Sequence, residues 1–386
     1  MSYLKVAISN FKSIGDITFD LQPLTILIGP PASGKSNILD ALGLLGYFNR
    51  FLLLDKEYNN QAINLEPLSV IARFDNQLQL FRNHDPANSV SLSVADNNIK
   101  LNLGLTWRPN FAIFINEKQI PWDLLTLPPA GDQSASNLRK ILSEIGKFIE
   151  SRLYGFDRYG LGIGQCASDQ YCGFHIRLRG VRTKPTPNNI LSELGWNVIN
   201  FTKGRGIVQR INNALREHLD ERIELKVLRS GALVLFDYDI EIEVRSVSDS
   251  VFRLIYYILA LSTASSYVKI YGLENSFIVL LEEPEAHIFP FMFDLLRNEI
   301  IHALKAGVTV VIATHNPIFV SALWDKIKEL ETYYVYRDSN LGSTRLVGLD
   351  IEKMAENLVN VEDILNMNWK EVVEKYSKAS EKRKVS

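Results

Sequence analysis

The chain has 386 residues and a formal net charge of −2, which excludes a global basic field, so any contact with nucleic acid must come from a local patch. Its 46% hydrophobic and 22% charged residues are typical of a globular protein with room for roughly two or three domains. The N-terminus has no signal-peptide pattern, and the longest apolar run, Leu254 to Leu261, is far shorter than the roughly 20 residues of a membrane span. We therefore expect a cytoplasmic protein without membrane contact.

The first 28 residues predict three strands. Residues 3–28 read as a strand, a turn at Ser13 to Gly15, a second strand (ITFDL), and a short buried strand, LTILI. Directly after it comes Gly29-Pro30-Pro31-Ala32-Ser33-Gly34-Lys35-Ser36, which fits the Walker A pattern, and then a helical stretch from Asn37. This order of strand, loop and helix is the one that phosphate binding requires.

The Walker A residues have separate predicted roles. The glycines let backbone N–H groups turn toward phosphate oxygens, and the following helix presents the positive end of its dipole to the same anion. Lys35 would reach the β- and γ-phosphates, and the Ser36 hydroxyl would bind Mg²⁺. A chance Gly-Lys turn is the alternative, and the flanking strand and helix argue against it.

The middle of the chain mixes predicted strands and helices. Short alternating segments between 66 and 120, PLSVIARF, QLQLF, VSLSVA, IKLNLGLTW and FAIFINE, predict an antiparallel β-lobe built of hairpins. Then follow an amphipathic helix (138–156), an irregular surface segment (155–189), two helical stretches (189–202 and 206–220) and a hairpin turning at Ser230-Gly231. Cys166 and Cys172 lack a second pair at zinc-ligand spacing, so we expect free thiols, with a disulfide as the alternative.

Acidic residues end a second buried strand. The stretch FIVLLEEPEAH (277–287) is an apolar run that ends in carboxylates, as a Walker B strand does. Glu282 would hold Mg²⁺ directly or through water, and Glu283 would orient and deprotonate the attacking water. The alternative is a solvated acidic turn.

Two further elements flank this strand. VTVVIATHNP (308–317) predicts a buried strand ending in Thr314 and His315, and an imidazole there could contact the γ-phosphate or the attacking water, although a structural role is the alternative. In 245–264, Ser248 is a good N-cap and Asp249 favours the first turn of a core helix. YYVYRD predicts a last strand before a helical tail with a charged end.

The order of these motifs resembles the ABC-type ATPase heads of the SMC, RecF and OLD group, in particular compact prokaryotic AAA ATPases. The matching stretches are ISNFKSIGDITFDLQPLTILIGPPASGKSNILDAL, RSVSDSVFRLIYYILAL, FIVLLEEPEAHIFP and VVIATHNPIFV, roughly a quarter of the chain. The resemblance implies an α/β P-loop NTPase fold, a mixed sheet with an inserted antiparallel β-lobe and a helical lobe. The expected segments are an N-terminal head part (1–60), the β-lobe (61–126), the helical lobe (127–225), a C-terminal head part (226–350) and a tail (351–386).

The resemblance also implies roles for individual residues. ATP and Mg²⁺ are the implied cofactors, with Glu283 as the catalytic base, His315 as the switch histidine, and Ser36 and Glu282 as metal ligands. Signature residues would act on the ATP of a second subunit in a head-to-head dimer. The expected nucleotide-binding residues are Lys12, Gly29, Pro30, Ser33, Gly34, Lys35, Ser36, Asn37, Ser248, Asp249 and Ser250.

Four positions depart from the family pattern. Glu282 replaces the usual Asp, Ser250 stands in place of the signature Gly, Phe289 replaces a second His, and Gln165 is only a candidate for the Q-loop. The first two favour a rival interpretation, a slow nucleotide-gated clamp for nucleic acid or a partner protein. A small-molecule kinase and a transporter ATPase fit less well. With neither a Toprim domain nor coiled coils, we expect no nuclease catalysis within this chain. By analogy with the family, the resemblance implies DNA repair or anti-phage defence with a separate nuclease partner.

Overall fold

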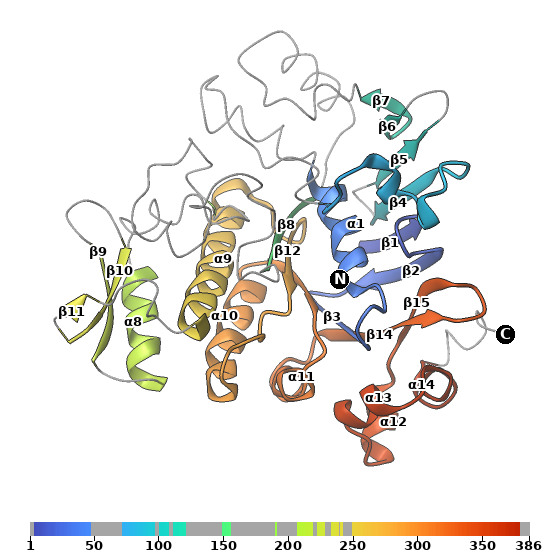
Figure 1. Cartoon of the computed structure of the whole chain (residues 1–386). Coiled ribbons are helices and arrows are strands. Elements are labelled where there is room, and N and C mark those ends of the chain that lie inside the picture. Colours follow the sequence, from blue (N-terminus) through green and yellow to red (C-terminus); the bar gives the residue numbers. More distant parts are fainter. Residues whose placement is uncertain are drawn as a thin grey trace, which may run out of the picture.

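The computed structural model describes residues 4–47, 72–96, 100–107, 111–120, 149–155, 190, 207–218, 222–227, 233–238, 240–241 and 249–378 (Figure 1). The strands are β1 (Leu4–Ser9), β2 (Asp16–Leu21), β3 (Leu24–Ile28), β4 (Val90–Ala95), β5 (Lys100–Thr106), β6 (Ala112–Ile115), β7 (Lys118–Ile120), β8 (Glu150–Tyr154), β9 (Ile223–Val227), β10 (Leu233–Asp237), β11 (Ile240–Glu241), β12 (Phe277–Glu282), β13 (Thr309–Ala313), β14 (Leu330–Asp338) and β15 (Ser343–Gly348).

The helices that accompany these strands are α1 (Lys35–Tyr47), α8 (Ile207–His218), α9 (Asp249–Tyr271), α10 (Phe293–Lys305), α11 (Pro317–Trp324), α12 (Ile351–Glu356), α13 (Val361–Asn366) and α14 (Trp369–Tyr376). Short 3₁₀ turns are η1 (Gln77–Leu80), η2 (Arg82–His84) and η4 (Pro290–Met292). Within these described residues, no helix is long and apolar enough to cross a membrane.

The central sheet places the ends of three strands in one row. Its order is β15-β14-β3-β13-β12-β8, and all neighbours are parallel except β14 and β15. Leu27 of β3 pairs with Ala313 of β13, and Ala313 pairs with Glu282 of β12. The chain therefore leaves β3, β13 and β12 at the same edge of the sheet, where ligands bind in open α/β folds.

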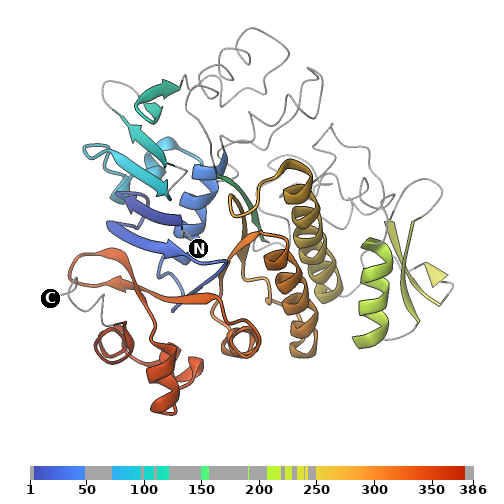
Figure 2. The same cartoon turned by 180° about the vertical axis from the view of Figure 1, so that it is seen from behind.

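Both faces of this sheet are covered, which explains its continuous apolar strands. Phe277, Val279 and Leu281 pack in the core formed with α9 and α10. Ile278 and Leu280 point to the other core, which they share with α1 and the strands β1 and β2. Figures 1 and 2 show α1 on one side of the central sheet and the pair α9 and α10 on the other. The alternation follows from the two-residue period of a strand.

The two other sheets are antiparallel. One has the order β2-β1-β4-β5-β6-β7, so the strands predicted for a β-lobe continue the N-terminal hairpin through the pairing of β1 with β4. The other, β11-β10-β9, packs beside α8 (Figure 1). The turn predicted at 230–231 and most of the helix predicted at 189–202 lie outside the described residues. The segment boundaries given above stay a prediction.

Three predicted elements are wrong. Residues 150–154, predicted as the end of a helix, form β8, because they pair in parallel with β12 along its free edge. The QLQLF segment forms η1 instead of a strand, since the Asn76 side chain accepts a hydrogen bond from Leu78 N (2.9 Å) and caps the turn. The strand over YYVYRD is not the last, because β15 pairs antiparallel with it.

Candidate functional site

The Walker A loop connects β3 to α1 through two glycines that no other residue could replace without strain. Gly29 has φ +150 and Gly34 has φ +102, values that side chains rarely adopt. A Cβ on Gly29 would lie 2.0 Å from the carbonyl oxygen of Val335, and one on Gly34 would lie 2.1 Å from Thr344 Oγ1. The loop is therefore packed directly against β14 and β15.

Polar contacts fix the outside of this loop. Thr344 Oγ1 donates to the carbonyl oxygen of Ser33 (2.9 Å) and lies 2.7 Å from Ser13 Oγ. Asn37 Nδ2 donates to the same Ser13 hydroxyl at 2.7 Å. Ser13 and Thr344 are 331 residues apart in sequence, so sequence reasoning gave no signal that they support the loop together.

The Lys35 ammonium folds back onto its own loop. Its Nζ donates to the carbonyl oxygens of Gly29 (2.8 Å) and Pro30 (3.0 Å). Burial lowers the pKa of Lys35, while the carboxylates Glu283, Glu282 and Glu285 act to raise it. The predicted phosphate-binding lysine and the predicted Walker B carboxylates thus lie within electrostatic reach of one another, as their strand ends require.

Arg73 joins the Walker A helix to the Walker B strand, and sequence reasoning missed it. Its Nε donates to Asp40 Oδ1 (2.7 Å), one terminal nitrogen donates to the carbonyl oxygen of Ser36 (3.0 Å), and the other donates to Glu282 Oε2. Although burial lowers the pKa of Arg73, the charges of Asp40 and Glu282 raise it above its ordinary value. One guanidinium therefore bridges the main chain of Ser36 and the carboxylate of Glu282.

Lys12 completes this charged cluster. Its Nζ donates to Asp40 Oδ2 (2.6 Å) and to the carbonyl oxygen of Ala72 (2.7 Å). Asp40 is only 1% exposed, and a buried carboxylate needs such partners. Lys12 and Arg73 also line a cavity of about 350 Å³ with Ser13, Gln79, Asn83, His84 and Arg337. Lys12 thus lies beside the Walker A helix, with its ammonium bonded to Asp40, and its predicted contact with the nucleotide stays a prediction.

The tip of the Walker B strand presents Glu283 beside His315. Glu283 has φ +42, and its N–H donates to the carbonyl oxygen of Ala313 (2.8 Å), which fixes it to the neighbouring strand. His315 Nδ1 lies 3.0 Å from Glu283 Oε1, and the two side chains are 53% and 44% exposed. The predicted base and the predicted switch histidine are thus a contacting, accessible pair.

Beneath this pair lies a buried carboxyl group that the sequence reasoning did not single out. Glu285 is 4% exposed, and its Oε1 accepts a hydrogen bond from Thr314 Oγ1. Burial raises the pKa of Glu285 to about 7, and the negative charge of Glu283 also raises it. The hydrogen bond from Thr314 lowers this pKa, but by less than burial raises it. The EEPE run was the available signal, but it does not say which carboxylate is buried.

The predicted signature is described only in part. Helix α9 begins at Asp249, and Ser250 Oγ donates to the carbonyl oxygen of His287 in the loop after Walker B. Tyr257, two turns along α9, donates to the carbonyl oxygen of Glu282 at 3.1 Å. Ser248, Gln165, Cys166 and Cys172 lie outside the described residues, so the predictions for them stay open.

Comparison with known proteins gives a family for the first part of the chain and a fold for almost all of it. Residues 1–151 match the AAA ATPase domain family. A crystal structure of an SMC head bound to the C-winged helix domain of ScpA is 14% identical, with a TM-score of 0.52 over 91% of this chain and 98% of that chain.

A second crystal structure, the SMC head domain from Pyrococcus furiosus with an extended coiled coil, bound to the C-terminal domain of ScpA, is 13% identical. Its TM-score is 0.52 over 94% of this chain and 100% of that chain. The chain has the fold of these SMC head domains. No curated protein matches it in sequence. The predicted fold class is thereby confirmed, and the Walker A loop lies within the matched AAA ATPase domain.

The residues predicted to bind Mg²⁺ are one carboxylate and one hydroxyl. The described residues contain no cluster of three or more His, Cys, Asp or Glu side chains that could hold a metal alone, but Mg²⁺ is commonly bound by one or two carboxylates together with substrate phosphates and waters. Glu282 supplies a carboxylate and Ser36 a hydroxyl, which are oxygen ligands of this kind. In this structure the Arg73 guanidinium bonds the Glu282 carboxylate and the main-chain carbonyl oxygen of Ser36, so a metal ion at Glu282 would have to replace Arg73 as its partner.

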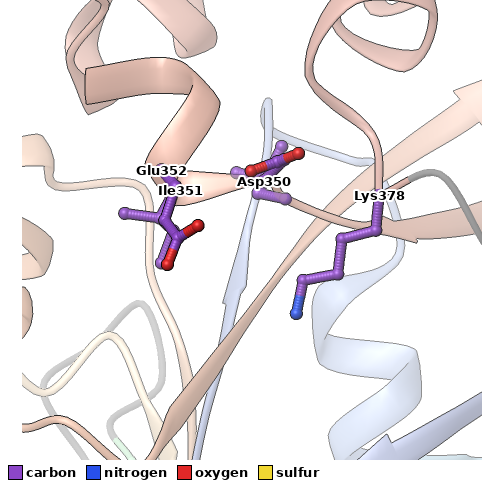
Figure 3. Close-up of a pocket in the computed structure, with 5 residues that line it drawn as sticks. Asp350, Ile351, Glu352 and Lys378 are labelled. Carbon is purple, nitrogen blue, oxygen red and sulfur yellow. The ribbon is translucent and has the colours of Figure 1, made fainter. Parts of the chain in front are cut away.

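A separate hollow of about 400 Å³ lies away from this site, between the segment after β15 and Lys378, which follows α14 (Figure 3). Two of its charged groups, Asp350 and Lys378, have structural partners. Asp350 caps α12 by accepting from Lys353 N (3.1 Å), and Lys378 Nζ bonds Glu331 at 2.6 Å. These contacts explain Asp350 and Lys378 without a ligand.

Proposed function

We propose that this SMC-type head is a Mg²⁺-dependent ATPase that converts ATP and water to ADP and phosphate. The observation that supports it most is the bridge made by Arg73 between Ser36, at the start of the Walker A helix, and Glu282, at the tip of Walker B. Two motifs far apart in sequence thus meet at one sheet edge, in a chain whose first 151 residues match an AAA ATPase domain.

In this proposal the loop from Gly29 to Asn37 holds the triphosphate, with Pro30, Ser33 and Gly34 in its turn. When ATP binds, Lys35 gives up its hydrogen bonds to the carbonyl oxygens of Gly29 and Pro30 and donates to phosphate oxygens instead. The phosphate oxygens are the stronger acceptors because they are charged. Ser36 and Glu282 hold Mg²⁺, and the bound ion neutralises charge on the phosphates. Arg73 then keeps Asp40 as its carboxylate partner.

The hydrolytic step is assigned to the exposed pair at the strand tips. Glu283 accepts a proton from the attacking water as the water oxygen bonds to the γ-phosphorus, and the bond to the bridging oxygen of ADP breaks. His315 lies 3.0 Å from Glu283 and donates to the γ-phosphate or to the water. Both side chains are accessible, as groups that meet a substrate must be.

We further propose that ATP closes two heads into a dimer and that hydrolysis reopens them. Ser248, Asp249 and Ser250 at the start of α9 contact the γ-phosphate held by the partner, so each nucleotide adds hydrogen bonds between subunits. We place the protein in the cytoplasm, in DNA repair or defence, with DNA or a separate nuclease as partner. This role rests on analogy with related heads.

The test is a phosphate-release assay on the wild type and on Lys35→Ala. Removing the ammonium that binds the β- and γ-phosphates should lower turnover by at least about 100-fold, because the negative charge on the phosphate oxygens in the transition state then loses the stabilising charge of Lys35. Lys326→Ala, at an exposed lysine away from the loop, is the matched control and should keep the wild-type rate. Equal rates for the wild type and Lys35→Ala would contradict the proposal.

A second candidate function is a slow nucleotide-gated clamp on nucleic acid or a partner protein. Two observations favour it: Ser250 uses its hydroxyl within its own subunit, and Glu282 is paired with Arg73. A clamp would bind DNA or a partner in an ATP-dependent manner while turnover stays near background. DNA binding measured at several salt concentrations, with and without ATP, separates the two functions.

A further inference from the structure

Glu285 is a buried carboxyl group with one partner. It lies in the turn that follows Walker B, is 4% exposed, and accepts through Oε1 from Thr314 Oγ1. Its second oxygen, Oε2, is buried without a hydrogen-bond partner among the described residues. Burying such a group is unfavourable, so its position calls for an explanation beyond packing.

The partner of Glu285 is held by the strand that carries the Walker A loop. Thr314 donates its N–H to the carbonyl oxygen of Leu27 on β3 (3.0 Å), and its Oγ1 accepts from Asn316 N (3.0 Å). Thr314 therefore has a fixed position between β3 and the start of α11. The hydrogen bond to Glu285 extends this fixed framework to the turn after Walker B.

That turn contains backbone under strain. Glu283 has φ +42 and His287 has φ +61, values that are unfavourable for residues with a side chain. Ala286 N donates to the carbonyl oxygen of Glu283 (3.0 Å), and Ile288 N donates to that of Glu285 (3.0 Å). Such a conformation persists only where surrounding contacts hold it, and the buried Glu285 side chain is the contact in the middle of the turn.

The exposed pair above the turn cannot position itself. Glu283 and His315 are each about half exposed, and ion pairs between exposed side chains contribute little, commonly below about 1 kcal/mol. Their relative placement must come from the backbone beneath them. Thr314 immediately precedes His315, and Glu285 follows Glu283 by two residues, so their buried side-chain hydrogen bond connects both segments, in addition to the main-chain bond from Glu283 N to Ala313.

We propose that Glu285 and Thr314 are positioning residues, a buried clamp that holds Glu283 and His315 in the geometry for hydrolysis. This inference rests on the proposed ATPase function. Neither residue is assigned a contact with the nucleotide. The clamp should therefore act on the rate of the chemical step and leave nucleotide affinity nearly unchanged.

The test compares Thr314→Val, which removes the hydroxyl at nearly constant volume, with Thr314→Ser, which keeps it. We expect Thr314→Val to lower kcat about 10- to 100-fold, as small displacements of catalytic groups do, while KM and the Kd of a fluorescent ADP analogue stay within about twofold. Thr314→Ser should retain most of the rate. Glu285→Ala should also lower kcat, and the double variant should fall no further than Thr314→Val, because Thr314→Val already removes the bond to Glu285 together with the bond from Asn316 N.

A second readout does not depend on activity. Hydrogen exchange of the backbone amides at 283–288 should become faster in Thr314→Val and stay at the wild-type rate in Thr314→Ser, with α10 as the internal control. An active wild type whose Thr314→Val variant keeps kcat within about twofold and the same exchange rates overturns the clamp alone. A wild-type rate no higher than that of Lys35→Ala overturns the proposed function instead.

Discussion

Arg73 makes the stability of the fold around this site depend on buried charge. It contacts Asp40, which is 1% exposed, and Glu282, which is 15% exposed. Arg73→Ala leaves Asp40 with Lys12 alone and removes the cation beside Glu282. Breaking a buried pair by removing one partner costs on the order of 3 kcal/mol, so the free energy of unfolding of the nucleotide-free protein, measured in urea, should fall by about that amount.

The matched control for Arg73 is an arginine whose carboxylate is accessible to water. Arg216 lies 3.4 Å from Glu224, and their side chains are 47% and 34% exposed. Arg216→Ala should cost less than about 1 kcal/mol, since water replaces the lost partner. Equal losses for the two variants would show that the Asp40 cluster is not the buried charge network described above.

Glu285 makes stability depend on pH in a direction that can be worked out. Burial raises its pKa to about 7 from an ordinary value of 4.5, so between these values the folded state keeps a proton that the unfolded state releases. This contribution to stability is fully present below about pH 4.5 and is lost as pH rises through about 7. Above pH 7 the charged buried carboxylate therefore destabilises the fold.

Glu285→Gln removes this titration while keeping the shape of the side chain. As pH rises from 4.5 to 8, the free energy of unfolding of the wild type should fall relative to that of Glu285→Gln by up to about 3 kcal/mol. Urea unfolding at several pH values measures it, and Glu356→Gln, at an exposed carboxylate, should show no such trend. A difference that stays constant with pH would mean that Glu285 does not titrate in this range.

At the level of elements, the sequence predicted what local pattern determines. The strands β1 to β3, β12 and β13 and the helix α9 have continuous or regularly spaced apolar residues, and the structure confirms them. β8 was predicted as helix because 138–156 has helical spacing, and only its pairing with β12 reveals a strand. Tertiary contacts of this kind override local preference.

The same distinction applies to the candidate site. Sequence motifs predicted Lys35, Ser36, Glu282, Glu283 and His315, because phosphate and water chemistry require those residue types after buried strands. The supporting residues escaped prediction, since their partners are distant in sequence: Arg73 bonds residues 33 and 209 positions away, and Thr344 bonds a residue 311 positions away. No local spacing encodes such contacts.

For the whole molecule, the start of α9 connects the proposed dimer surface to the catalytic turn. Ser250 bonds the carbonyl oxygen of His287, and Tyr257 bonds that of Glu282. Helix α9 is thus joined by one hydrogen bond to each end of the turn that carries Glu283, and the bond from Ser250 lies at the start of the helix. Association and hydrolysis are thereby coupled within each head in this proposal.

The dimer can be tested in a variant that binds ATP without turning it over. Glu283→Gln should elute as a dimer with ATP and as a monomer without it, measured by size-exclusion chromatography with light scattering. Adding Ser250→Tyr places a bulky ring where the partner's phosphate must approach closely, so this double variant should stay a monomer. It should still bind a fluorescent ATP analogue, because Ser250 does not contact its own subunit's nucleotide in this proposal.

Two outcomes would contradict this arrangement. A double variant that dimerises as fully as Glu283→Gln would show that the start of α9 is not in the interface. A Glu283→Gln protein that stays a monomer with ATP would contradict the head-to-head dimer itself.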